Sequence, residues 1–128
     1  MKHIASLLMI SSLFSMPLVA GAHAYLVQST PVDGSTVSVT PDHFLLVFSE
    51  SAHLTALGIH KDGDAGTQRI ESLPKEPNGH FLILAPKLTT GVYTLTFRTI
   101  ATDDGHITSG SIRFTVAAEA KPAAPTSN

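Results

Sequence analysis

The clearest structural signal in this chain is the stretch Gly91-Val92-Tyr93-Thr94-Leu95-Thr96-Phe97-Arg98. Within it, the apolar residues Tyr93, Leu95 and Phe97 alternate with two threonines and an arginine. Side chains along a strand point to opposite faces of the sheet in turn, so this period of two predicts a strand with one buried face. No segment of the sequence sustains the period of a helix. The pattern therefore indicates a domain built from strands.

Similar segments lie on both sides of this stretch and are separated by turn residues. Ile112, Phe114 and Val116 repeat the alternation near the end of the chain. The other expected strands are Tyr25–Gln28, Val37–Val39, His43–Phe48, Ala56–His60 and Phe81–Leu84. The residues between Phe48 and Ala56, which include His53, are expected to form a loop. About seven short strands in one small domain predict an all-β fold, an immunoglobulin-like sandwich of two sheets.

Residues 1–22 are expected to be a cleaved secretory signal peptide. A short basic start precedes a largely apolar run from Ile4 to Leu18, and Ala20-Gly21-Ala22 supplies the small residues of a cleavage site. A membrane anchor is the alternative, but the run is broken by Pro17 and is shorter than the roughly 20 residues that span a bilayer. We therefore expect an exported, periplasmic protein whose mature chain is not inserted in the membrane.

The place of the cut determines which residue begins the mature domain. Cleavage after Ala22 makes His23 the first residue of a domain that covers 23–116. Cleavage after Ala24 also satisfies the small-residue rule and would remove His23. Residues 117–128 are rich in alanine, proline, threonine and serine and lack a hydrophobic pattern, so they are predicted to be a disordered tail.

The composition restricts the chemistry that this domain can perform. There is no cysteine, and the three methionines all fall within 1–22, so the mature chain contains no sulfur. Soft Cu(I) sites are built from thiolate or thioether ligands, so none is expected. The formal net charge is −2 and no basic run is present, which argues against nucleic acid or an anionic membrane as a partner. No nucleophile motif of the Gly-x-Ser-x-Gly kind appears, so hydrolysis is not expected.

Six histidines remain in the mature chain. His43 leads into an apolar strand, while His60 and His80 stand beside turns, so a structural or exposed role is the ordinary interpretation of these three. His53 follows Glu50 and is harder to assign from the sequence.

His23 and His106 carry a more specific signal. An N-terminal histidine offers its α-amine and its imidazole to one metal ion. Asp104 and His106, in the loop Thr102-Asp103-Asp104-Gly105-His106, can add a carboxylate oxygen and a third nitrogen. Cu(II) prefers such a tetragonal set of nitrogen and oxygen donors, although zinc accepts the same residues and an ordinary Asp-Gly hairpin turn is the alternative without a metal.

Taken together, these segments resemble the CopC/PcoC family of periplasmic copper-resistance proteins. The resemblance extends from His23 to about Val116. The residues that carry it are His23–Pro31 with Asp33-Gly34-Ser35, Leu46–Glu50, Gly91–Arg98 and Asp104–Ser111.

The resemblance implies a cupredoxin-like Greek-key barrel or sandwich that binds copper without enzymatic turnover. It implies that His23, through its amine and imidazole, together with Asp104 and His106, binds one Cu(II) per chain. It also implies a membrane partner of the CopD type, and we expect the protein itself to be a monomer. The Glu50 carboxylate is either an auxiliary donor or the ion-pair partner of a cation such as Arg98.

Two departures from the family pattern refine this expectation. Some members carry a methionine-rich loop that forms a Cu(I) site, but residues 51–66 contain no methionine here, so the single-site Cu(II) members are the better match. Phe97 stands where the family usually has tryptophan. Two other functions remain open: a copper oxygenase with an N-terminal histidine brace, and an immunoglobulin-like binding module without a metal.

Overall fold

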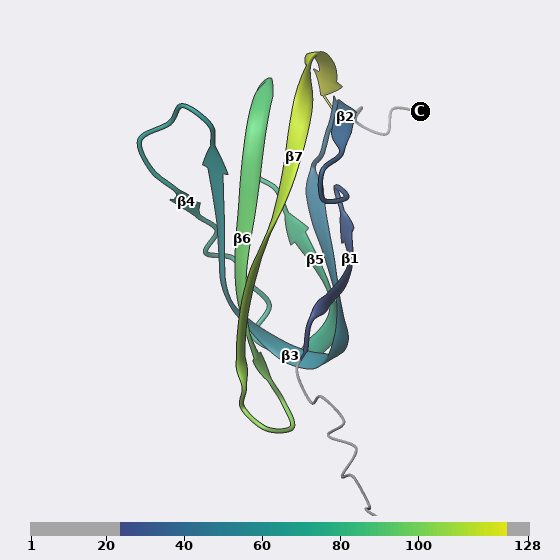
Figure 1. Ribbon diagram of the computed structural model, residues 1–128, viewed down its shortest axis with the longest axis vertical. Coiled ribbons are helices and arrows are strands. Elements are labelled where there is room, and N and C mark those ends of the chain that lie inside the picture. The colour runs from purple at the N-terminus through teal and green to yellow at the C-terminus, as the bar shows by residue number, and fades with distance from the viewer. Residues whose placement is uncertain (1–23, 123–128) are drawn as a thin grey trace, which may run out of the picture.

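Seven strands form the described part of this computed structural model, which covers residues 24–122, with side chains up to residue 118 (Figure 1). The predicted signal peptide and His23 lie outside the described residues, as do residues 123–128. The strands are β1 (Leu26–Thr30), β2 (Thr36–Thr40), β3 (His43–Lys61), β4 (Gln68–Arg69), β5 (Asn78–Leu84), β6 (Gly91–Ala101) and β7 (Ile107–Pro122). The all-β prediction is confirmed, and among these residues no helix could cross a membrane.

The longest strand, β3, takes part in both halves of the sheet. Its residues up to Val47 pair mainly with β1 on one side and β5 on the other. From Ala52 onward it pairs with β6 and, farther along, with β4. The sheet continues from β6 to β7, and β7 pairs in parallel with β2. Figure 1 shows β3 bending between its two halves, so one continuous sheet curls into the two facing layers of the predicted sandwich.

The prediction of a loop between Phe48 and Ala56 is wrong, because β3 continues through these residues. The polar residues there resemble a loop in sequence, yet the backbone from Ala52 to Leu54 pairs with β6, and His53 lies opposite Ile100. Register shifts between Val47 and Ala52, and again at Thr55, absorb the bend without ending the strand. His53 is therefore a strand residue close to the bend.

The predicted start of a disordered tail at residue 117 is also too early in the sequence. β7 runs to Pro122, and Lys121 and Pro122 pair with Val39 and Thr40 of β2. A neighbouring strand can hold a segment through backbone hydrogen bonds even where its sequence lacks a hydrophobic pattern.

The core lies on the concave side of the curled sheet. Tyr93, Leu95 and Phe97 of β6 are all buried, as their alternation predicts. The ring of Phe97 packs edge-on against Phe48, with ring centroids 5.3 Å apart. Gly110, its partner on β7, leaves room for this ring, because a Cβ there would lie 2.5 Å from the Phe97 Cζ atom.

The hydroxyl of Tyr93 fixes the turn that leads into β6. It donates to the carbonyl oxygen of Thr89 at 2.7 Å and accepts from the Thr89 amide at 2.9 Å. This arrangement is the tyrosine corner of immunoglobulin-like sandwiches. The ring itself stacks on Phe114 at 5.6 Å, so the hydroxyl and the packing can be separated experimentally.

We expect Tyr93→Phe to lower the free energy of unfolding by about 1–2 kcal/mol, because the Thr89 amide loses its partner while the ring packing stays. Denaturation by urea measures this change. A variant as stable as the wild type would show that the hydroxyl contributes nothing to the fold.

Candidate metal centre

A second, small core lies at the end of the molecule where β3 bends. It consists of three buried alanines, Ala24, Ala52 and Ala101. Ala24 is the first described residue, Ala52 follows the bend, and Ala101 ends β6, where it pairs with Ala52. Because only methyl groups separate these segments, the start of the described chain lies beside the loop that follows β6.

Hydrogen bonds fix the direction in which the chain enters β1. The Tyr25 amide donates to the Ser49 hydroxyl at 3.1 Å, and the Ser49 amide donates to the Tyr25 carbonyl oxygen at 2.8 Å. Both bonds join the chain just after Ala24 to the bend of β3. The start of the described chain is therefore anchored to this bend.

The loop between β6 and β7 is held by the same bend. The Thr102 hydroxyl donates to the Ser51 carbonyl oxygen at 2.7 Å, and the Thr102 amide donates to the same oxygen at 3.2 Å. The loop closes on itself through the Gly105 amide, which donates to the Ala101 carbonyl oxygen at 3.0 Å. Gly105 has a φ of 71°, a conformation that favours glycine.

Asp104 and His106 meet on this loop. The His106 amide donates to Asp104 Oδ1 at 3.0 Å, and His106 Nδ1 lies 2.5 Å from Asp104 Oδ2. The His106 side chain is 59% exposed and that of Asp104 is 26% exposed. The predicted carboxylate and imidazole are therefore adjacent and open to solvent, where an arriving ion can reach them.

Three other described histidines, His43, His60 and His80, do not join this pair. His43 Nδ1 pairs with Asp42 at 3.1 Å at the start of β3, and His60 Nδ1 lies 2.9 Å from the Gly66 carbonyl oxygen. His80 is exposed on β5. Each has a location that needs no metal.

Glu50 lies in the bend of β3 and His53 follows it, and Thr102 joins the loop between β6 and β7 to this bend. Both are partly buried. Among the described residues, Glu50 forms no ion pair with Arg98. Within residues 24–118, no three histidine, aspartate or glutamate side chains gather as a ligand set, and His23 lies outside that range.

The sequence did not reveal Thr102 or the three alanines. A single threonine and scattered alanines have no distinctive pattern, and their role depends on contacts between segments far apart in the chain.

The fold and this end of the molecule define a small all-β domain that carries an acid–histidine loop beside the start of the described chain. The chain belongs to the CopC family, because the model of the CopC domain matches residues 26–117.

Among solved structures, the chain is similar to the crystal structure of CopC from Methylosinus trichosporium OB3b, with 24% identity and a TM-score of 0.59. That match covers 82% of this chain and 100% of the other, and it supports the same fold. A search of curated proteins finds no match.

Proposed function

We propose that this protein is a periplasmic Cu(II) carrier or buffer that holds one ion per chain with His23, Asp104 and His106. The observation that carries the proposal is the Asp104–His106 pair, presented on a loop that a shared alanine core joins to Ala24. Family membership supports a role in copper resistance. Copper is the cargo of the protein, so no turnover is required of the site.

The chemistry of the donors fits Cu(II). Asp104 supplies a charged oxygen and His106 an imidazole nitrogen, and removal of the signal peptide after Ala22 would supply the amine and imidazole of His23. Three nitrogens and one oxygen suit the tetragonal preference of Cu(II). Export to the periplasm and delivery to a membrane partner of the CopD type are parts of the same proposal.

The metal preference tests this function. We expect the mature protein to bind Cu(II) tightly and Cu(I) poorly, because none of the proposed donors is soft. Competition with a Cu(II) chelator and, under reducing conditions, with a Cu(I) chelator measures both affinities. Equal or tighter binding of Cu(I) would contradict the proposed ligands.

The same titrations at several pH values add an independent check. Imidazoles and amines bind metals only after losing a proton, so protons compete with the ion. Cu(II) affinity is therefore expected to fall as the pH is lowered from neutral. An affinity that does not change with pH would exclude nitrogen donors.

Thr102 is expected to affect the site without contacting the ion. Thr102→Val keeps the shape of the side chain but removes the hydrogen bond to the Ser51 carbonyl oxygen. We expect Cu(II) affinity to fall roughly tenfold, at the lower end of the effects seen for residues that orient metal ligands. Isothermal titration with Cu(II) and a competing chelator measures the change.

Two variants control for a general loss of stability. Thr102→Ser keeps the hydroxyl and should restore the affinity. Thr55→Val removes a similar bond, from the Thr55 hydroxyl to the Arg98 carbonyl oxygen at 3.1 Å, and should leave Cu(II) binding unchanged. If both valine variants lowered the affinity equally, Thr102 would have no specific positioning role.

A further inference from the structure

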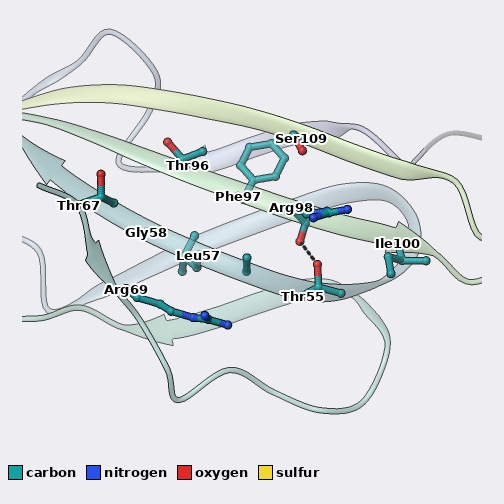
Figure 2. A pocket seen from close by; sticks show the side chains of 11 residues that line it. Thr55, Leu57, Gly58, Thr67, Arg69, Thr96, Phe97, Arg98, Ile100 and Ser109 are labelled. Atoms are coloured by element: carbon teal, nitrogen blue, oxygen red, sulfur yellow. Dashed lines mark hydrogen bonds between the residues drawn. The ribbon is translucent and has the colours of Figure 1, made fainter.

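The chain has three arginines, and they differ in their partners. Arg113 forms an ion pair with Asp62 at 2.5 Å. Arg69 and Arg98 are exposed, and neither guanidinium has an ion pair or hydrogen bond with the described residues. Both line one groove of about 820 Å³ on the outer side of the sheet, which Figure 2 shows from close by.

The strand register explains why the two arginines face the same groove. Arg98 on β6 lies opposite Ala56 of β3, and Arg69 on β4 lies opposite Gly58. Ala56 and Gly58 are two residues apart, so all four positions share one face of the sheet. β3 runs between the two arginines, whose strands are roughly 10 Å apart.

The strand between the arginines has only small side chains on this face. Ala56 has a methyl group, and Gly58 leaves space that the methyl group of Thr67 occupies: a Cβ on the glycine would come within 2.8 Å of it. Hydroxyl groups of Thr96 and Ser109 add donors and acceptors along the groove. The result is a shallow trough with an uncharged floor and a cation on each side.

A second groove of about 460 Å³ continues the first, because Thr55 and Arg69 line both. Lys75 adds another cation to it, and Glu71 is its only carboxylate. The two grooves together therefore carry three permanent cations and one anion, on a chain whose net charge is −2. This local positive charge is a property of the face and not of the whole protein.

We propose that this groove docks an extended acidic segment of a partner protein. Guanidinium groups bind carboxylates in bidentate geometry, and two of them about 10 Å apart can each take a carboxylate of one extended segment. Only small groups lie between them, the Ala56 side chain and the Thr67 methyl group over Gly58, so an extended backbone can lie between the two arginines. Nucleic acid fits less well, because single strands bind to exposed aromatic rings and Phe97 is buried.

The groove leads toward the candidate metal centre. Beyond Arg98, the next residue of β6 on the same face is Ile100, which lies opposite His53. β6 ends at Ala101, and the loop that carries Asp104 and His106 follows. A partner docked by its acidic segment would lie beside that loop. The docking itself does not require copper, so it can fail or succeed independently of the proposed function.

Fluorescence anisotropy with a labelled peptide tests the docking. The probe is a short peptide in which glutamate alternates with valine, and its counterpart has glutamine in place of glutamate. We expect the wild-type protein to bind the glutamate peptide saturably and the glutamine peptide about tenfold more weakly. The double variant Arg69→Gln/Arg98→Gln should bind the glutamate peptide about tenfold more weakly than the wild type, since each exposed pair contributes modestly.

Control variants separate the groove from general electrostatics. Lys87→Gln removes one charge outside both grooves and should change binding far less than Arg98→Gln does. Arg69→Glu/Arg98→Glu should bind a peptide of alternating lysine and valine better than the wild type does, which also shows that the variant is folded. Equal losses for Lys87→Gln and Arg98→Gln, no difference between the two wild-type peptides, or tighter binding of a thymidine oligonucleotide would overturn the proposal.

Discussion

Replacement of His106 by alanine is expected to weaken Cu(II) binding by at least about a hundredfold, because changes to groups that only orient a metal ligand already cost roughly 10–100-fold. The variant removes an imidazole nitrogen from the proposed site and breaks its contact with Asp104. Its EPR spectrum should show fewer coordinated nitrogens than that of the wild type. Competition with a Cu(II) chelator measures the affinity.

Variants of Asp104 and of three other histidines supply the comparison. Asp104→Ala should weaken binding less than His106→Ala, because copper favours imidazole over carboxylate. His43→Ala, His60→Ala and His80→Ala should leave the affinity nearly unchanged, since each of these histidines lies outside the metal loop. An unchanged affinity and spectrum for His106→Ala would exclude this loop from the site.

Blocking the α-amine of His23 is expected to have an effect of similar size. Acetylation of this amine removes one nitrogen donor but leaves the imidazole in place. Without the amine the chelate cannot form, and we expect Cu(II) affinity to fall by about a hundredfold, as for the loss of any ligand. Semisynthetic protein with a free or an acetylated His23, titrated in parallel, provides the measurement.

The fold should not respond to this modification. Tyr25 keeps its hydrogen bonds to Ser49, and Ala24 keeps its place in the small core. Thermal unfolding without copper should therefore be the same for both forms. If acetylated and free protein bound Cu(II) equally well, the amine would not be a ligand.

Much of the fold could be predicted because local patterns decide it. The alternation of Tyr93, Leu95 and Phe97 predicts both the strand and its buried face, and all three are buried. The continuity of β3 could not be predicted in this way. Its bend contains Ser49, Glu50 and Ser51, polar residues that are typical of loops, and its backbone there bonds to Tyr25 and Thr102, which are far away in the sequence.

The candidate site, too, could be predicted from the sequence only where its contacts are local. Asp104 and His106 are neighbours in sequence, and a turn with glycine between them brings their side chains together, so their pairing follows from local geometry. The anchoring of the loop by Thr102 to Ser51 joins residues 51 positions apart. Such a contact depends on how β3 and β6 pair, and no local pattern marks it.

The proposed copper site is tested by the intact mass of the exported protein under native conditions, measured before and after addition of Cu(II). We predict a mature chain that begins at His23 and gains the mass of one copper ion. A chain that begins at Tyr25, or one that begins at His23 and gains no copper, would contradict this prediction.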